Sequence, residues 1–312
     1  MTRRILERLA ASFAVIFGAS TLIFLILNWL PGDTAALIAG EGASEETIVR
    51  IRAQLGLGRP IGQQYWDYMV GLLHGDLGHS YATRAPVLQE IAGQFPATGS
   101  LALAAAAVAI AVGVPLGVTA AAYRGRLPDQ GIQVAGLTLH SIPAFWLGLL
   151  AILLFSVRLR WLPVLGGNGF SASVLPVGCL GIAMSVSIQR LVRSGIIEAL
   201  QEPYVTTLRA KGLRASQIFY VHVLRNVALS TITLLGVLVG ELFSGLVVIE
   251  TLFARPGLGR LAVYAMGNKD IPLVQGAILV TSATYVAVNL LVDLSYAWID
   301  PRIRIAAANE GA

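Results

Sequence analysis

The chain has 312 residues, of which 56% are hydrophobic and only 12% are charged. That charged share is about half that of a typical soluble domain, and the mean hydropathy is +0.73, so a soluble fold of this length could not bury so much apolar surface. The net charge of +5 does not indicate nucleic acid, because the basic residues flank apolar runs and form no patch interleaved with aromatic residues. The composition therefore predicts an integral membrane protein.

Six apolar runs are long enough to cross the roughly 30 Å of hydrocarbon in a bilayer as helices. They cover residues 9–30, 98–122, 133–157, 174–198, 227–251 and 272–298. Helices are expected because an open strand would leave backbone groups unpaired in lipid. The first run is long for a secretory signal and no small-residue cleavage site follows it, so it is expected to remain. The predicted fold class is all-α with six transmembrane helices.

The segment 31–97, between the first two runs, carries local signals for helices. Ser44 is suited to cap a helix with acidic residues in its first turn, and Gly56 is suited to close it. A second amphipathic stretch covers residues 60–73, and a turn follows at 75–78. We expect a small helical cap on the outer face of the membrane, with a merely structural loop as the alternative.

The distribution of basic residues predicts the orientation, because Lys and Arg gather in cytoplasmic loops. With the N-terminus inside, the inner segments carry Arg3, Arg4, Arg8, Arg124, Arg126, Arg190, Arg193, Arg209, Lys211, Arg214, Arg225, Arg302 and Arg304. The short outer loops carry only Arg158, Arg160, Arg255, Arg260 and Lys269. Both termini are therefore expected in the cytoplasm. The expected organisation is an N-terminus with the first helix (1–30), an extracytoplasmic cap (31–97), a membrane core (98–298) and a cytoplasmic tail (299–312).

The cytoplasmic loop 199–226 is too long for a simple connection and is rich in polar groups. Pro203 suits the first turn of a short helix. Arg209 and Lys211 fall in the last turn, where cations favour the carbonyl end of the helix dipole, and Gly212 can adopt the left-handed cap conformation. A second helix is expected to lead into the fifth run. Such a short helix, held along the membrane surface, is suited to dock a soluble partner.

This loop contains a run that extends over Tyr204, Val205, Thr206, Arg209, Ala210, Lys211, Gly212 and Leu213, followed by His222, Leu224, Arg225 and Asn226. The run resembles the coupling loop of peptide-type ABC importer permeases, a group that includes dipeptide, oligopeptide and nickel permeases. Gly212 stands at the glycine of the general importer signature. The residues at 206–208 replace its Glu-Ala-Ala, and His222 and Arg225 stand at its Ile and Pro; these departures fit the peptide group.

Further motifs extend the resemblance over nearly the whole chain. They are Pro31-Gly32-Asp33, Leu55-Gly56-Leu57, Gly75-Asp76-Leu77-Gly78, Pro86-Val87, Ser141-Ile142-Pro143-Ala144-Phe145, Trp161-Leu162-Pro163, a run from Glu250 to Gly259, and Asp300-Pro301-Arg302. Each motif is weak alone, but their order and spacing together are specific. The long outer segment after the first helix resembles the B-type subunit of the permease pair.

The resemblance implies a type I ABC importer permease in the bacterial cytoplasmic membrane, with a definite set of partners. It implies a homologous second permease subunit in the lipid bilayer, two cytoplasmic ABC ATPase subunits, and an extracytoplasmic substrate-binding protein. The motif residues from Tyr204 to Leu213 would contact an ATPase, and ATP and Mg would be held by those ATPases, with no cofactor in this chain. The expected cargo is a di- or oligopeptide, with nickel chelates, opines and sugars as alternatives.

An enzymatic role is not expected from the sequence. It contains no G-x-x-x-x-G-K-[ST] phosphate loop, so ATP hydrolysis is assigned to partners. The four histidines, His74, His79, His140 and His222, form no HExxH or other close ligand cluster. A role for His74 and His79 in nickel passage is left open, beside an ordinary role as hydrogen-bonding loop residues.

An ion-coupled secondary transporter is the main alternative of a different class. Such proteins need charged residues inside the membrane, and Glu241 and Asp293 lie within the fifth and sixth runs; the coupling-loop motif nevertheless favours the importer. The candidates for a substrate path are Ser141, Pro143 and Glu241, the last as a contact for a peptide amino group or as a structural hydrogen-bonding group. Pro115 and Pro143 are expected to kink their spans.

Small residues between 101 and 122 allow another helix to approach closely. They are suited either to an interface with the second permease subunit or to packing within this chain, and packing within the chain is slightly favoured.

Overall fold

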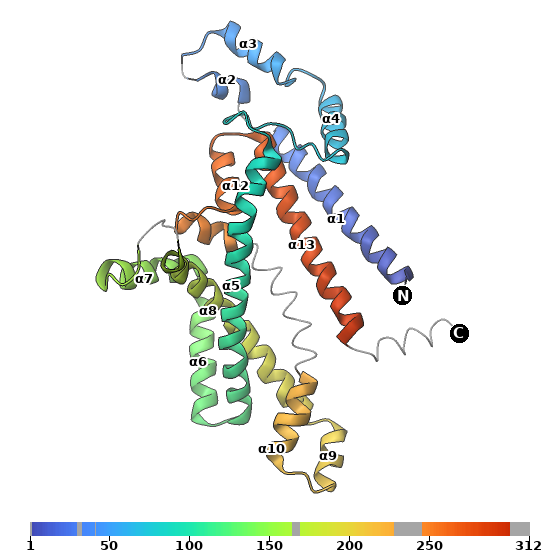
Figure 1. Cartoon of the computed structure of the whole chain (residues 1–312), viewed down its shortest axis with the longest axis vertical. Coiled ribbons are helices and arrows are strands. Elements are labelled where there is room, and N and C mark those ends of the chain that lie inside the picture. The colour runs from blue at the N-terminus through green and yellow to red at the C-terminus, as the bar shows by residue number, and fades with distance from the viewer. Residues whose placement is uncertain (1, 30–32, 41, 164–168, 228–244, 300–312) are drawn as a thin grey trace. The chain divides into compact units, whose positions relative to one another are not determined.

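The computed structural model describes residues 2–29, 33–40, 42–163, 169–227 and 245–299 (Figure 1). Within these ranges the named elements are all helical, and a single antiparallel bridge joins His79 to Pro86. The elements are α1 (Thr2–Trp29), α2 (Thr34–Ala39), α3 (Glu45–Gln54), α4 (Ile61–Leu73), α5 (Val87–Ala122), α6 (Leu127–Ser141), α7 (Ala144–Ala151), η1 (Ile152–Arg158), α8 (Phe170–Ala199), α9 (Pro203–Ala210), α10 (Ala215–Gln217), η2 (Ile218–Val223), α12 (Leu258–Gly267) and α13 (Ile271–Ile299). The elements η1 and η2 are π-helices.

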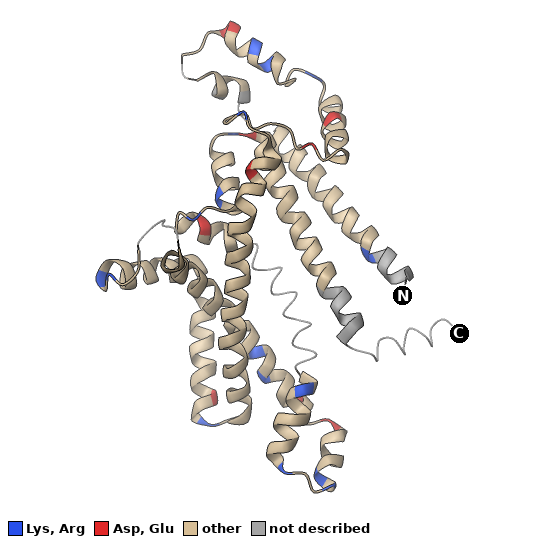
Figure 2. Cartoon of the chain, in the orientation of Figure 1, with Lys and Arg blue, Asp and Glu red and all other residues tan. Residues whose placement is uncertain are grey.

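Four of these helices contain segments that are long and apolar enough to cross a membrane: Arg8–Trp29, Val87–Ala122, Phe170–Ala199 and Ile271–Leu291. They confirm the first, second, fourth and sixth predicted spans. The second begins at Val87 rather than at residue 98, because the helix α5 continues without a break from the outer segment into the apolar run. Charged residues are sparse along these helices and most lie near helix ends and in loops (Figure 2).

The third predicted span, 133–157, is wrong as a continuous helix. The helices α6 and α7–η1 meet at a bend of 98°, which makes the pair either a broken span or a re-entrant loop. The break falls at Ile142, which is extended at φ −92° and ψ 122°, and at Pro143. Proline disfavours a helical conformation for the residue before it and has no N–H to donate. Pro115, by contrast, lies inside the uninterrupted helix α5.

Most of the fifth predicted span, 227–251, lies outside the described residues, and so do the candidate Glu241 and the tail 300–312. Residues 245–252 are helical. The predicted number of six spans therefore stays a prediction.

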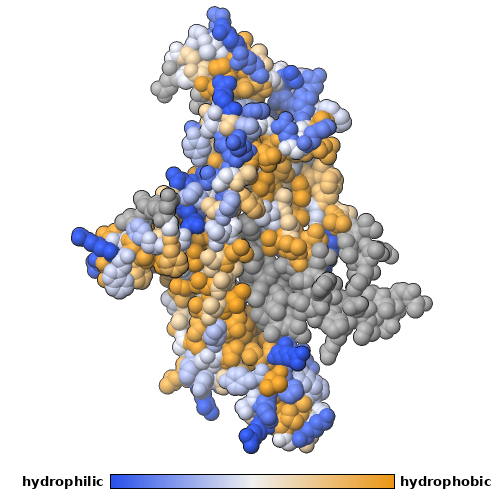
Figure 3. Space-filling view, viewed as in Figure 1, coloured by the Kyte–Doolittle hydropathy of each residue, from blue (hydrophilic) through white to orange (hydrophobic). Residues whose placement is uncertain are grey.

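The described residues divide into two compact units: 99–255 with 287–299, and 2–98 with 256–286. In the first unit, glycines bring α5 and α8 together. A Cβ on Gly113 would lie 2.6 Å from the Ser185 carbonyl oxygen, and one on Gly117 would lie 2.7 Å from that of Gln189. Small residues thus serve packing within this chain. Orange, hydrophobic side chains cover much of the face shown in Figure 3, as expected of a surface that meets lipid.

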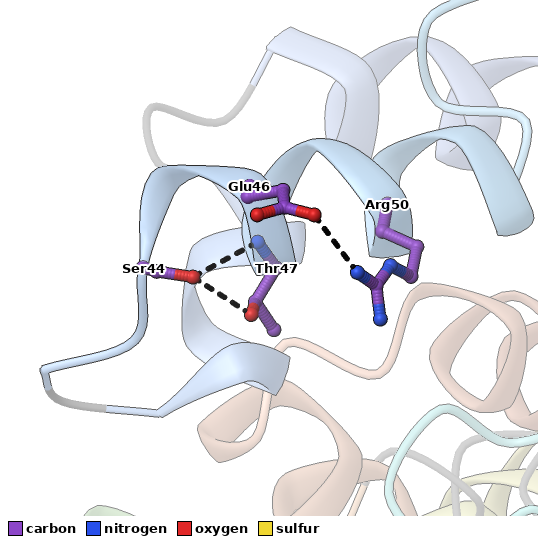
Figure 4. Close-up of polar contacts among 4 residues, drawn as sticks. All are labelled: Ser44, Glu46, Thr47 and Arg50. Carbon is purple, nitrogen blue, oxygen red and sulfur yellow. Dashed lines mark hydrogen bonds and ion pairs between the residues drawn. The ribbon is translucent and has the colours of Figure 1, made fainter.

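In the second unit, the helix α3 is formed as the local signals predict (Figure 4). The Ser44 hydroxyl accepts a hydrogen bond from the Thr47 N–H at 3.3 Å, and its oxygen lies 2.9 Å from that of the Thr47 hydroxyl. At the other end Gly56 has φ +68°, and the Leu57 N–H donates to the Arg52 carbonyl at 3.1 Å. This bonding closes the helix with a Schellman motif.

Ser44→Ala should destabilise α3 by about 1 kcal/mol, because the first turn then loses an acceptor for one of its orphan N–H groups. Hydrogen exchange at the amides of the first turn measures the change. Arg50→Ala is the matched control: the Arg50–Glu46 pair spans 3.1 Å, but its side chains are 65% and 84% exposed, so its removal should cost no more than about 0.5 kcal/mol. An equal effect of both substitutions would contradict the capping role.

Asp270 organises the junction between the outer segment and α13. Its carboxylate is fully buried and accepts hydrogen bonds from the Ser80 hydroxyl at 2.5 Å, the Ala82 N–H at 3.1 Å and the Leu273 N–H at 3.3 Å. The first two donors belong to the loop after α4, and the third belongs to the first turn of α13. One side chain therefore joins segments that are 190 positions apart.

Asp270→Ala should destabilise this unit by about 3 kcal/mol or more, because it leaves a buried hydroxyl and two N–H groups without their acceptor. Limited proteolysis in the loop 79–83 is the measurement. As a control, Asp76→Ala removes another carboxylate that accepts a backbone N–H, from Gly78 at 2.8 Å, but from an exposed position; it should cost about 1 kcal/mol. Protection of the loop in the Asp270→Ala protein would contradict the prediction.

Candidate functional site

The predicted short helix of the loop 199–226 is present as α9 and has the expected ends. Pro203 occupies its first position, after an extended Glu202, and Arg209 lies in its last turn. Gly212 follows with φ +80°. The Gly212 N–H donates to the Arg209 carbonyl at 2.9 Å, and the Leu213 N–H donates to the Leu208 carbonyl at 3.2 Å. These two bonds are those of the Schellman motif, which needs a left-handed residue at its centre.

The inner face of α9 is apolar and anchored. Val205 is only 1% exposed and belongs to a cluster with Ile196 at the end of α8 and with Ile218 and Val223 of η2. Tyr204, Leu208 and Leu213 pack against the same cluster. Since both flanking elements contribute to this cluster, α9 is anchored by packing against α8 and η2.

The outer face of α9 is polar and cationic. The exposed residues of the predicted motif are Thr206, Arg209, Ala210, Lys211 and Gly212. Neither the Arg209 nor the Lys211 side chain has an ion-pair or hydrogen-bond partner within the described part of the chain. The positions of basic residues along the ribbon are coloured blue in Figure 2. A rigid helix with one anchored and one exposed cationic face is suited to bind a partner that carries acidic groups. It can pass a displacement of that partner to the helices against which its anchored face packs.

A buried ion pair links α8 to α6 in the same unit. The Arg193 Nε and Nη2 atoms donate to the two Asp129 carboxylate oxygens at 2.7 and 2.8 Å, and the Asp129 side chain is 5% exposed. The Gly125 N–H also donates to Asp129 at 2.9 Å. No pattern in the sequence indicates this pair, because its partners are 64 positions apart. In the sequence, Arg193 counted only among the basic residues that predict the cytoplasmic side.

The motif that runs from Glu250 to Gly259 has a structural explanation. Phe253 is buried in an apolar cluster, and the Arg255 guanidinium donates to the Ser173 hydroxyl at 2.6 Å and to that of Ser100 at 3.4 Å. These bonds join Ser100 of α5 to the first turn of α8 through Arg255. Sequence reasoning treated Arg255 only as a basic residue of an outer loop and missed this role.

The grouping of the three candidates for a substrate path stays a prediction, because only two of them lie in the described part of the chain. Ser141 and Pro143 lie on either side of the break between α6 and α7, and the Ser141 hydroxyl donates to the Leu137 carbonyl at 2.9 Å. Glu241 lies outside the described residues. Among the described residues, no three His, Cys, Asp or Glu side chains are grouped to hold a metal ion.

Comparison with protein families places the chain in a known class. The model of the binding-protein-dependent transport system inner membrane component matches residues 113–305, and the corresponding model of the N-terminal part of such membrane components matches residues 1–102. The chain therefore belongs to the family of inner membrane components of binding-protein-dependent transport systems. It is a multi-pass membrane protein and a transport component rather than an enzyme.

Individual relatives agree over the full length. A protein of Brucella abortus (strain 2308) named as a peptide transport system permease is 42% identical over 312 residues, which is 97% of this chain and 99% of the relative. The glutathione transport system permease protein GsiC of Escherichia coli O6:H1 is 38% identical over 304 residues, again 97% and 99%. An inward-facing MetNI methionine ABC transporter structure superimposes with a TM-score of 0.53 at 16% identity, over 68% of this chain and 97% of that one. That likeness confirms the fold of a type I ABC importer permease.

Proposed function

We propose that this chain is one of two permease subunits of an ATP-driven peptide importer, and that α9 is the helix through which an ATPase subunit drives it. The observation that carries the proposal is the construction of α9, with Val205 buried against α8 and η2 and with Arg209 and Lys211 exposed. A second permease subunit, two ATPases that hold ATP and Mg, and an extracytoplasmic binding protein complete the proposed assembly. The bias of basic residues supports cytoplasmic termini.

Closure of the ATPases would press on the exposed face of α9, which carries Thr206, Arg209 and Ala210 and continues into Lys211 and Gly212. Because the opposite face shares one apolar cluster with α8 and η2, this displacement moves the attached helices as a rigid body. The Asp129–Arg193 pair extends the rigid body to α6. Alternating access then follows from a two-state equilibrium that the nucleotide biases.

Peptides are the proposed cargo because both full-length relatives support it. One is named for peptide transport and the other for glutathione, which is itself a small peptide. The alternative of an ion-coupled transporter is not favoured, because the family works with binding proteins. The proposed residues of the substrate path remain Ser141, Pro143 and Glu241.

The experiment is the ATPase rate of the complete transporter in lipid with its binding protein, across di- to octapeptides and nickel chelates. Stimulation by peptides is the expected result. Stimulation by nickel chelates alone would show that the chain belongs to an ATP-driven importer whose substrate is a nickel chelate and not a peptide. A chain that does not assemble with any ATPase would refute the proposal.

A further inference from the structure

A cavity of about 180 Å³ lies in the second unit, lined by the end of α1, the loop 55–59, α4, Tyr81 and the start of α13. Its polar lining comes from Asn28, Arg59, Gln64, Asp67, Tyr68, Tyr81 and Gln275. These residues belong to the end of α1, the cap, the loop after α4 and the first turns of α13. The volume corresponds to about six waters, which is room for a solute of amino-acid size.

Three of the lining side chains have hydrogen-bonding capacity that the protein does not use, and one of them is the buried Tyr68 hydroxyl. Gln275 is 7% exposed, and within the described part of the chain neither its amide nor the Tyr81 hydroxyl has a hydrogen-bond partner. Burial, and then the nearby Asp270 carboxylate, raise the pKa of Tyr81 to about 12, so that its hydroxyl remains a donor at neutral pH. The Asn28 amide nitrogen donates to the Phe24 carbonyl at 2.9 Å, which leaves its oxygen as an acceptor. Buried polar groups of this kind normally have partners.

The mouth of the cavity carries one cation and one anion. The Arg59 Nη1 atom lies 3.0 Å from the Asp67 Oδ2 atom, and the two side chains are 61% and 59% exposed. An exposed pair of this kind contributes little net free energy, about 0–1 kcal/mol. A ligand that carries both charges close together can therefore replace the Arg59–Asp67 pair by two new ion pairs at a small cost in free energy.

We propose that this cavity binds a compact zwitterion, with its anionic group on Arg59, its cationic group on Asp67 and its polar body against Gln275 and Tyr81. A simple ion does not fit this lining, because the two charges at the mouth cancel. The chemistry is that of a free α-amino acid and equally that of a phosphoethanolamine lipid headgroup. The position is compatible with both sources, because the apolar segment of α1 ends at Trp29 and that of α13 begins at Ile271, which places the cavity at the membrane boundary.

Only the placement of the cavity on the outer side rests on the proposed function. The test measures binding of radiolabelled L-alanine and of O-phosphoethanolamine to the purified, delipidated complete transporter without its binding protein. Gln275→Leu and Asp67→Asn should each weaken binding at least tenfold. Asp67 is exposed, so its variant should fold even if the buried Gln275 substitution does not. The exposed Gln63→Leu, on α4 but outside the cavity, is the matched control and should leave binding unchanged.

Binding of L-alanine that these variants weaken would identify a free amino acid as the ligand, and binding of phosphoethanolamine alone would identify the lipid headgroup. No binding of either probe, or equal binding to the wild-type and both variant proteins, would overturn the inference. Peptide-stimulated ATPase activity is measured in parallel. Normal stimulation without probe binding would refute only the inference that the cavity binds a zwitterion. Failure to assemble with an ATPase would refute the proposed function. In that case, probe binding to the isolated chain would still test whether the cavity binds a zwitterion.

Discussion

Gly212→Val should uncouple ATP hydrolysis from transport, with a loss of at least tenfold in transport and no loss of membrane insertion. Gly212 has φ +80°, and a Cβ placed on it would meet no atom within 4 Å, so the penalty comes from the backbone and not from a clash. A left-handed conformation costs an ordinary L-residue about 1–2 kcal/mol, and a β-branched residue is less suited still. The end of α9 would then lose the Schellman bonds that fix its direction.

A graded series makes this prediction sharper. Gly212→Asn should retain most of the transport, because asparagine tolerates the left-handed region, and Gly212→Ala should fall between the asparagine and valine variants. Gly131→Ala is the control: Gly131 lies inside α6 with open space around it and no left-handed backbone. Transport at the wild-type rate in the Gly212→Val protein would contradict the assignment of α9 as the coupling helix.

Arg193→Met should destabilise the assembled transporter by about 3–5 kcal/mol, because it leaves the Asp129 carboxylate buried without its partner. Asp129→Ala should cost less, because the Arg193 side chain that it leaves is 23% exposed. The pair is bidentate, at 2.7 and 2.8 Å, and its acidic partner is only 5% exposed. Thermal unfolding in detergent, followed by the loss of the monodisperse complex, is the measurement.

The double variant measures the interaction energy between the two side chains apart from their contacts with other residues. Asp129→Ala with Arg193→Met should be clearly less destabilised than the sum of the single variants, since no unpaired charge remains. Strict additivity would show that the two side chains act independently. Arg50→Ala, which breaks only an exposed pair on α3, should leave the melting temperature unchanged within error.

Local signals in the sequence predicted most of the local structure. Composition predicted the spans that α1, α5, α8 and α13 contain, since apolar runs of this length have no other stable solution. Pro203 and Gly212 predicted both ends of α9 because capping depends on the nearest residues alone. Ser44 predicted the start of α3 for the same reason.

Contacts between distant segments could not be predicted in this way. The Asp270–Ser80 hydrogen bond joins residues 190 positions apart, and the Asp129–Arg193 pair joins residues 64 positions apart; neither leaves a local pattern. The break at Pro143 could be predicted only in part. Proline predicted a kink, but the 98° bend depends on how the two halves pack, which periodicity does not record.

The most direct test of the central claim is cross-linking between α9 and an ATPase subunit. The only cysteine of the chain, Cys179, is buried, so Cys179→Ala provides a cysteine-free background for Thr206→Cys on the exposed face of α9. Thr138→Cys, exposed on α6, is the control. The account predicts that Thr206→Cys forms cross-links to the ATPase in the intact transporter, that their yield changes when ATP binds, and that Thr138→Cys forms none. Cross-links from Thr138→Cys alone, or none from Thr206→Cys in a transporter that still hydrolyses ATP, would contradict it.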